Sequence, residues 1–151
     1  MNPSLLDQMT RLQLTNQLVY FDEEKIHFLD HYFPDHNQKR RAAEKTLADY
    51  TSVVESILRD LNEETLNSVA LIGSKLELRY LDDGSTESYT IVFPDQTDPA
   101  SGHVSFLSPI GFQLLMTRRD DVRQLAVPYG ETSVKVEEVK FVNHGTVHER
   151  F

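Results

Sequence analysis

Apolar side chains in residues 4–33 recur at intervals of three and four, and the segment contains no glycine. This spacing aligns them on one face of an α-helix and predicts one long helix. Pro34 disfavours helical geometry at the preceding residue, so the helix should end at Phe33 after about 40 Å. The first stripe is a heptad-like seam interrupted by polar residues: Leu5, Met9, Leu12, Asn16, Val19, Glu23, Ile26, Asp30 and Phe33. A second stripe widens the apolar face: Leu14, Leu18, Phe21, Phe28 and Tyr32.

A second helix is predicted from about residue 38 to residue 61. Its apolar positions keep the helical spacing: Ala43, Leu47, Tyr50, Val54, Ile57 and Leu61. Its polar positions are expected to face water: Arg40, Arg41, Glu44, Lys45 and Glu55. Because the connection FPDHNQ is short, the two helices must return antiparallel. No third helix follows to cover the pair, so we interpret it as a projecting finger with its tip at residues 33–37, in preference to a compact bundle.

From residue 67 the apolar period changes to two, which predicts β-strands. GSKLELRYL and ESYTIVF alternate around the turn DDGS, and VRQLAV and TSVKVEEVKFV flank the turn PYGE. With the alternating stretch from His103, the pattern predicts four or five antiparallel strands. Ser108 and Pro109 then begin one short helix, since serine caps helices and proline is favoured at the first helical position. The predicted fold class is α+β, with a helical hairpin at 1–66, a β-sheet domain at 67–143 and a flexible tail at 144–151.

Composition narrows the range of partners. The 151-residue chain has a net charge of −9 and no cysteine. This charge repels phosphate backbones, so direct binding of nucleic acid is disfavoured, while a basic protein surface or a metal ion is an easier partner. The absence of cysteine excludes disulfides and thiolate sites. No segment has the length of a membrane span or the pattern of a signal peptide, so we expect a cytoplasmic protein that does not bind membranes.

Several motifs in the second half together resemble the C-terminal domain of the Gre transcription elongation factors. They are Ile72 to Leu78, Val104 to Gly111 with its Ser-Pro, Leu114-Leu115, Pro128-Tyr129-Gly130-Glu131 and Val134 to Phe141. The preceding helical hairpin has the length of the family's antiparallel coiled coil. The resemblance implies an FKBP-like β domain that docks on bacterial RNA polymerase and a coiled coil that enters the polymerase's secondary channel. The polymerase contact carries over to this chain at Leu107, Ser108, Pro109 and Ile110.

The tip departs from the family pattern. Cleavage-stimulating Gre factors carry Asp-Leu-x-Glu-Asn there, and the two acids help hold a second Mg²⁺ at the polymerase active site. This chain has Phe33-Pro34-Asp35-His36-Asn37, so Asp35 is the only acid in the loop, with Asp30 about a turn earlier. A metal role for Asp30 and Asp35 stays open, with Mg²⁺ shared with the polymerase and no cofactor of the protein's own. The alternative is that Asp35 caps the second helix.

The resemblance therefore implies a monomeric accessory factor that is not itself an enzyme. It would regulate transcription elongation without efficient transcript cleavage. Rnk-like proteins are related factors directed to the same channel. It contacts nucleic acid only through the transcription complex. The first alternative is a cleavage factor that uses Asp30 and Asp35.

Three further classes of function remain as alternatives. An FKBP-type prolyl isomerase would need an aromatic-lined pocket, for which the candidates are Phe93, Phe106, Phe112, Tyr129 and Phe141. A zinc or nickel site would use His27 and His31, four residues apart, with Asp30, Asp35 and His36 nearby. A coiled-coil adaptor would self-associate through the seam, against which the polar residues Asn16, Glu23 and Asp30 argue.

Overall fold

The computed structural model describes residues 5–142 and residue 147. The chain forms two compact units, a helical unit that ends at Leu61 and a β unit that begins at Asn62. The boundary was expected after residue 66, but the short helix α4 (Glu63–Leu66) belongs with the second unit. The predicted tail at 144–151 lies outside the described residues, apart from Val147.

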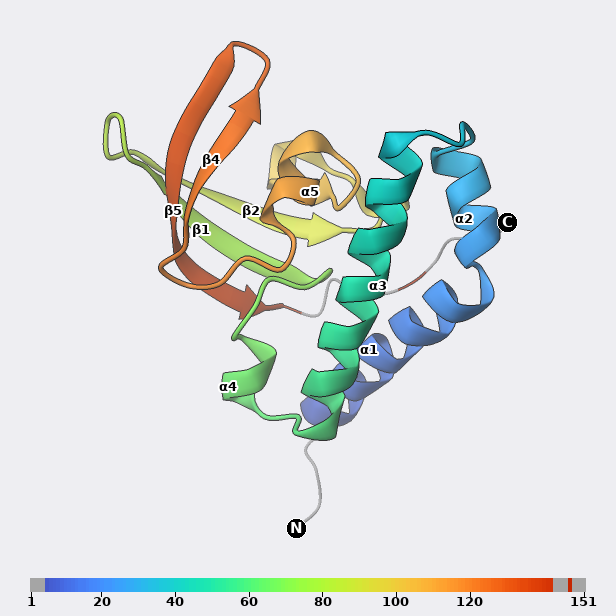
Figure 1. The fold of residues 1–151 in the computed structure, drawn as a ribbon. Coiled ribbons are helices and arrows are strands. Elements are labelled where there is room, and N and C mark those ends of the chain that lie inside the picture. Colours follow the sequence, from blue (N-terminus) through green and yellow to red (C-terminus); the bar gives the residue numbers. More distant parts are fainter. Residues whose placement is uncertain (1–4, 143–146, 148–151) are drawn as a thin grey trace. The chain divides into compact units, whose positions relative to one another are not determined.

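The helical unit consists of α1 (Leu5–Glu23), α2 (Lys25–Tyr32) and α3 (Gln38–Arg59) (Figure 1). The prediction of one helix over residues 4–33 is wrong, because the chain bends at Glu24, whose φ of −110° and ψ of 8° are not helical. At 1.5 Å per residue, α1 and α2 therefore span about 28 and 12 Å. α3 returns antiparallel to α1, and the Arg11 guanidinium donates to the Leu58 carbonyl at 3.3 Å near the open end. The antiparallel return was predicted; a coiled coil is not shown.

Four aromatic rings on both sides of the bend pack together in the core of this unit. The Phe28 centroid lies 6.2 Å from that of Tyr20 and 5.9 Å from that of Phe21, in edge-to-face geometry. Phe21 also meets Tyr50 of α3 at 6.0 Å. Such edge-to-face pairs add stability beyond the area that they bury.

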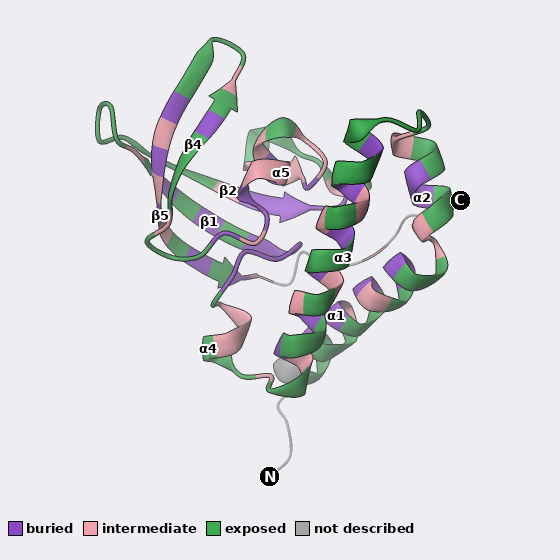
Figure 2. Cartoon of the chain, viewed as in Figure 1, coloured by how far each residue is buried: buried purple, intermediate pink, exposed green. Residues whose placement is uncertain are grey.

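The helix seam predicted for α1 is not the face that α3 covers. Its large apolar side chains, Met9, Leu12, Val19 and Ile26, are 46–62% exposed, whereas Leu14, Phe21 and Phe28 of the second stripe are buried (Figure 2). The two stripes lie on nearly opposite sides of the helix, since residues separated by 3.6 positions share a face. Periodicity identifies both stripes as apolar but does not show which one meets the partner helix.

One polar pair is buried between α1 and α3. The Tyr50 hydroxyl donates to Oε1 of Gln17 at 2.6 Å, and both residues are 0% exposed. A buried polar group is costly unless it is hydrogen-bonded, and here the Tyr50 hydroxyl and the Gln17 side-chain oxygen satisfy each other. The pair therefore links a defined face of α1 to a defined face of α3.

The β unit contains a five-stranded sheet in the order β3-β2-β1-β5-β4. Its strands are β1 (Ser74–Tyr80), β2 (Thr86–Val92), β3 (His103–Ser105), β4 (Val122–Val127) and β5 (Gly130–Phe141). Two short 3₁₀ turns, η1 (Pro94–Gln96) and η2 (Pro99–Ser101), precede β3, and α5 (Pro109–Leu114) follows it. The prediction of a wholly antiparallel sheet is wrong, because β3 runs parallel to β2. Alternation reports which face of a strand is buried and carries no information on its direction.

One face of the sheet supplies most of the core of the β unit. Leu76 and Leu78 of β1 lie opposite Val139 and Val136 of β5, and all four are at most 5% exposed. The register shifts between Glu77 and Leu78, where Glu137 of β5 has no partner on β1. No helix among residues 5–142 is long and apolar enough to cross a membrane.

Candidate functional site

The segment from β3 into α5 is a rigid loop organised by Ser108. Its backbone N–H donates to the Ser105 carbonyl at 3.0 Å, and its Oγ donates to the same carbonyl at 2.7 Å. The Ser108 Oγ also accepts from the Gly111 N–H at 3.1 Å, which caps the helix, and Pro109 follows at the first position. The predicted capping role of Ser108 is therefore confirmed.

The four residues expected to contact the polymerase lie together on this loop, and they differ in exposure. Pro109 is exposed, whereas Leu107, Ser108 and Ile110 are half-buried. The preceding Phe106 is buried against Phe93, with ring centroids 5.5 Å apart. The buried residues anchor the loop, so Pro109 is presented to solvent in a constrained conformation.

Gly111 allows α5 to approach β3 closely. A Cβ atom at this position would collide with the backbone carbonyl of Ser105, and it would also lie 3.0 Å from Ser108 Oγ. The collision involves backbone, which cannot move as a flexible side chain would. The glycine is therefore required by packing, and it sets the position of the Ser-Pro loop against the sheet.

Gln113 attaches the other side of α5 to the edge strand β4. Its Nε2 donates to the carbonyls of Pro109 at 2.8 Å and Ala126 at 3.2 Å, and its Oε1 accepts from the Ala126 N–H at 2.9 Å. The side-chain amide thus pairs with both backbone groups of Ala126, as a neighbouring strand would. The role of Gln113 was not predicted from the sequence. Hydrophobic periodicity gave no signal for it, because a glutamine is not part of an apolar pattern.

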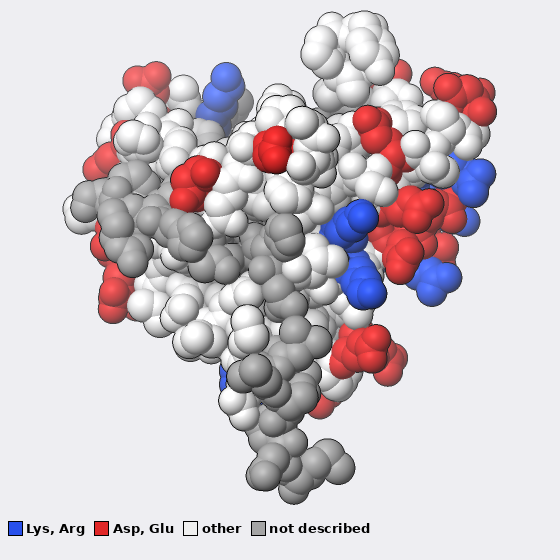
Figure 3. Space-filling model, turned by 180° about the vertical axis from the view of Figure 1, so that it is seen from behind, with Lys and Arg blue, Asp and Glu red and all other residues white. Residues whose placement is uncertain are grey.

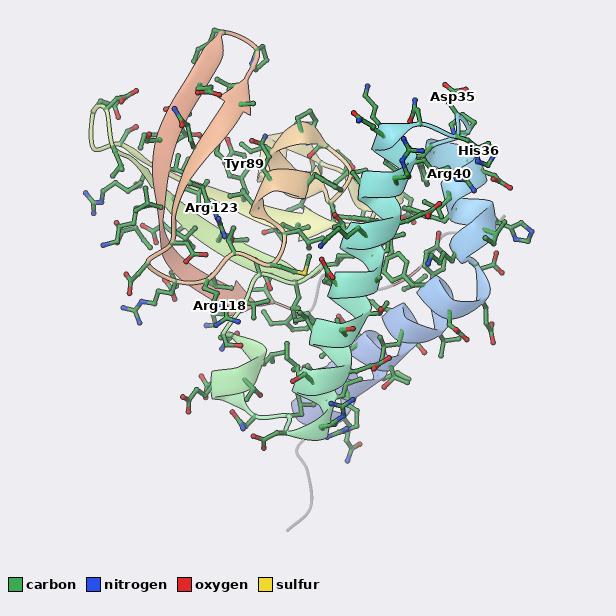
Figure 4. The ribbon with its side chains drawn as sticks, in the orientation of Figure 1. Asp35, His36, Arg40, Tyr89, Arg118 and Arg123 are labelled. Carbon is green, nitrogen blue, oxygen red and sulfur yellow. The ribbon has the colours of Figure 1, made fainter. Side chains whose placement is uncertain are left out.

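The tip of the helical unit is held by Arg40, which was expected to face water and is instead 6% exposed. Its Nη1 donates to Oδ1 of Asp30 at 2.9 Å and to the Phe33 carbonyl at 3.0 Å, and its Nε donates to Oε1 of Glu44 at 3.4 Å. Figure 4 shows Arg40 reaching from α3 toward α2, with Asp35 and His36 on the connecting loop. The guanidinium joins the two helices because its several donors serve several acceptors at once.

Asn37, not Asp35, caps α3. Its side-chain oxygen accepts from the backbone N–H groups of Lys39 at 3.0 Å and Arg40 at 3.3 Å. The alternative role predicted for Asp35 is therefore wrong. Pro34, Asp35 and His36 are exposed and Phe33 is half-buried at the C-cap of α2.

The predicted metal residues are not assembled into a site within this chain. Among the described residues, no three His, Asp or Glu side chains converge where they could hold a metal ion. Asp30 is bound to Arg40, while His27 contacts Oε2 of Glu24 through Nδ1 at 3.0 Å. The His31 ring packs edge-on against Tyr32, with centroids 4.6 Å apart. These contacts give no support to a zinc or nickel site, and a Mg²⁺ shared between Asp30, Asp35 and the polymerase stays a prediction.

The aromatic residues considered for an isomerase pocket are dispersed. Phe93 and Phe106 pack on each other in the core, Phe141 is buried, Phe112 is half-buried and Tyr129 is 85% exposed. A groove of about 560 Å³ lies instead in the helical unit, between α1 and α3. Leu18, Phe21 and Leu47 are among its apolar lining residues, and Asp22, Lys25 and Glu55 are among its charged ones. The positions of these five residues give no support to an aromatic ligand pocket of the FKBP type.

Two tyrosines and a glutamate form a polar cluster on β1 and β2. The Tyr80 hydroxyl donates to Oε2 of Glu87 at 2.7 Å and lies 3.5 Å from the Tyr89 hydroxyl. Burial raises the pKa of Tyr80 strongly above its usual value, and the hydrogen bonds to Tyr89 and Glu87 act in the same direction. Burial also raises the pKa of Tyr89, so both phenols stay protonated near neutral pH.

Comparison with known proteins agrees with the resemblance seen in the motifs. A profile of the family described as "Transcription elongation factor, GreA/GreB, C-term" matches residues 65–141. A GreA of Desulfovibrio desulfuricans is 29% identical over 108 residues, which cover 71% of this chain and 67% of the relative. A GreA of Nitratidesulfovibrio vulgaris is 32% identical over 94 residues, covering 60% of this chain and 59% of the relative.

Solved structures give the same fold. A GreA/GreB elongation factor from Nitrosomonas europaea aligns with a TM-score of 0.57 at 22% identity, over 78% of this chain and 91% of its own. It has the same order of an N-terminal helical part and a C-terminal β domain. The matched segments span roughly three fifths to two thirds of the first two curated relatives. On the strength of the residues matched in its β unit, the chain belongs to the GreA/GreB family of transcription elongation factors.

Proposed function

We propose that the protein regulates transcription elongation by binding bacterial RNA polymerase through the loop Leu107–Ile110 of its β unit. The family membership supports polymerase as the partner, and the rigid, capped loop with an exposed Pro109 supports the contact. The loop geometry favours binding, since little conformational entropy is lost when a constrained segment is immobilised. The protein acts as a monomer and meets nucleic acid only within the transcription complex.

We further propose that the helical unit acts in the secondary channel without efficient transcript cleavage. The observation that carries this proposal is the bond between Asp30 and Arg40. An acid that helps hold a catalytic Mg²⁺ must offer its oxygen atoms to the cation, but Oδ1 of Asp30 already accepts from the Arg40 guanidinium. Asp35 is then the one acid left on the loop between α2 and α3.

The docking contact is tested by measuring the affinity of the full chain for core RNA polymerase. Pro109→Ala should weaken binding several-fold, because it removes an exposed contact without removing the Ser108 cap. Pro99→Ala is the matched control, since Pro99 is also an exposed proline at the start of a short helical turn. Equal affinities for the wild-type protein and Pro109→Ala would refute the assigned contact.

The cleavage part is tested with a backtracked elongation complex in the presence of Mg²⁺. The wild-type protein should bind but leave the rate of transcript cleavage unchanged, and Asp35→Ala should behave in the same way. Stimulated cleavage that is lost in Asp35→Ala would instead establish the cleavage-factor alternative with Asp30 and Asp35.

A further inference from the structure

The turn between α5 and β4, residues 116–121, carries two adjacent arginines and is here called the arginine loop. Met116 and Asp120 both have positive φ values, 67° and 72°, although neither is glycine. Such conformations cost free energy and persist only where the surroundings hold them. The arginine loop is therefore a constrained segment, and its exposed residues are Arg118, Arg119 and Asp120.

Backbone hydrogen bonds hold the arginine loop at both ends. Met116 N–H donates to the Ala70 carbonyl at 2.8 Å, and Ala70 N–H donates to the Thr117 carbonyl at 2.8 Å. At the other end, Asp120 N–H donates to the Val136 carbonyl at 2.7 Å. Inside the loop, the Asp121 carboxylate accepts from the Arg118 N–H at 2.9 Å. The two arginines are consequently displayed from a backbone that loses little freedom on binding.

Basic side chains gather around this loop in a unit that is otherwise acidic. Residues 62–146 contain seven Lys and Arg and thirteen Asp and Glu, a net charge of −6. Acidic side chains are scattered over the face seen in Figure 3. Four of the seven basic residues are nevertheless on or in contact with the arginine loop, Arg118, Arg119, Arg123 and Lys135, and Arg79 lies opposite Lys135 on β1.

The nearby acids are already engaged by three of these bases. Arg123 pairs with Asp121 at 3.3 Å, Lys135 with Asp120 at 3.7 Å, and Arg79 with Glu137 at 2.9 Å. Among the residues that the structure describes, neither the Arg118 nor the Arg119 guanidinium has an ion pair. Figure 4 shows Arg118 on the loop and Arg123 on β4. The neighbourhood thus keeps a local charge of about +2 that no acid of the β unit neutralises.

We propose that Arg118 and Arg119 bind a carboxylate-rich surface on the protein to which the β unit docks, which under the proposed function is RNA polymerase. A guanidinium matches a carboxylate with two parallel hydrogen bonds, so two adjacent guanidiniums suit two neighbouring acids. An extended phosphate backbone is a poorer match, because it would also meet the negative field of the remaining surface. A compact acidic patch on a protein avoids that repulsion.

The test measures the affinity of the full chain for core RNA polymerase between 50 mM and 500 mM salt. The double variant Arg118→Glu/Arg119→Glu should bind about tenfold more weakly at low salt, with the difference shrinking as salt rises. Arg118→Lys/Arg119→Lys keeps the charge but loses the paired hydrogen bonds, so its affinity should fall between those of the wild-type protein and the Glu/Glu variant. Lys140→Glu is the control, since it reverses an exposed charge of the same unit away from the loop.

The outcomes separate this inference from the proposed function. Polymerase binding that is equally strong in the wild-type protein and the Glu/Glu variant would overturn the role of the arginine loop and leave the docking proposal intact. Failure of the wild-type protein to bind polymerase would overturn both. Binding of a short single-stranded RNA or duplex DNA by the isolated protein, abolished in the Glu/Glu variant, would replace the acidic protein surface with a phosphate ligand and overturn the inference as stated.

Discussion

Replacing Arg40 with alanine removes one guanidinium that bonds to three groups at the tip of the helical unit. The Phe33 carbonyl would lose its donor, and the buried stem would leave space at the tip, together costing about 1–3 kcal/mol. The side chains of Asp30 and Glu44 are 59% and 44% exposed and would regain water. Their ion pairs should therefore add only ~0–1 kcal/mol each. We expect the free energy of unfolding to fall by about 3 kcal/mol, the middle of a summed range of about 1–5 kcal/mol.

The assay is urea unfolding followed by circular dichroism at the helical band. Arg41→Ala is the matched control, because Arg41 is the next residue on α3, is exposed, and makes no side-chain ion pair among the described residues. It should change the free energy of unfolding by less than about 0.5 kcal/mol. A loss in Arg40→Ala no larger than in Arg41→Ala would refute the view that the guanidinium holds the tip. Asp30→Asn should give a loss of at most about 1 kcal/mol, since that carboxylate is exposed.

Three further outcomes follow from contacts elsewhere in the chain. Gly111→Ala should lower the free energy of unfolding by about 1–3 kcal/mol, because its Cβ meets the Ser105 carbonyl; an unchanged thermal midpoint would contradict that packing. Leu12→Gln should cost less than about 0.5 kcal/mol, while Leu14→Gln should cost several, as denaturant titration can show; equal losses would mean that the buried stripe is wrongly assigned. The raised pKa of Tyr80 means that folding favours the protonated phenol, so stability should decline as pH rises above about 10, and ultraviolet titration should find Tyr80 ionising later than free tyrosine.

The parts of the fold that follow from local rules could be predicted from the sequence. The spacing from Ala43 to Ile57 gives α3 with its buried face, and Ser108-Pro109 gives the start of α5. The alternation in GSKLELRYL and TSVKVEEVKFV gives β1 and β5, two of the three interior strands of the sheet. Each of these depends on neighbours within one or two turns of the chain, where periodicity and capping preferences are informative.

The predictions that were wrong concern features that depend on how separate elements meet in space. Arg40 was expected in water because arginine is usually exposed, but its burial results from acceptors ten, seven and four residues away on two helices. The bend at Glu24 could not be predicted, because no proline or glycine lies in this part of the sequence. The direction of β3 depends on the path of the chain through residues 94–101, and the alternation of apolar and polar residues carries no information on that path. For the candidate site, the Ser-Pro loop was found through its motif, whereas Gln113 and the arginine loop needed the tertiary structure.

The hydrogen bond between Gln17 and Tyr50 has a consequence for how the helical unit is assembled. Turning α1 half a revolution would bring Met9, Leu12 and Val19 against α3 and would satisfy the hydrophobic effect nearly as well. That alternative would turn the Gln17 amide toward water and leave the buried Tyr50 phenol without its acceptor, a loss of about 1–3 kcal/mol. A helix with apolar side chains on two opposite sides is thus given a single orientation by one polar pair. The specificity of helix packing is supplied by an interaction that adds little to net stability.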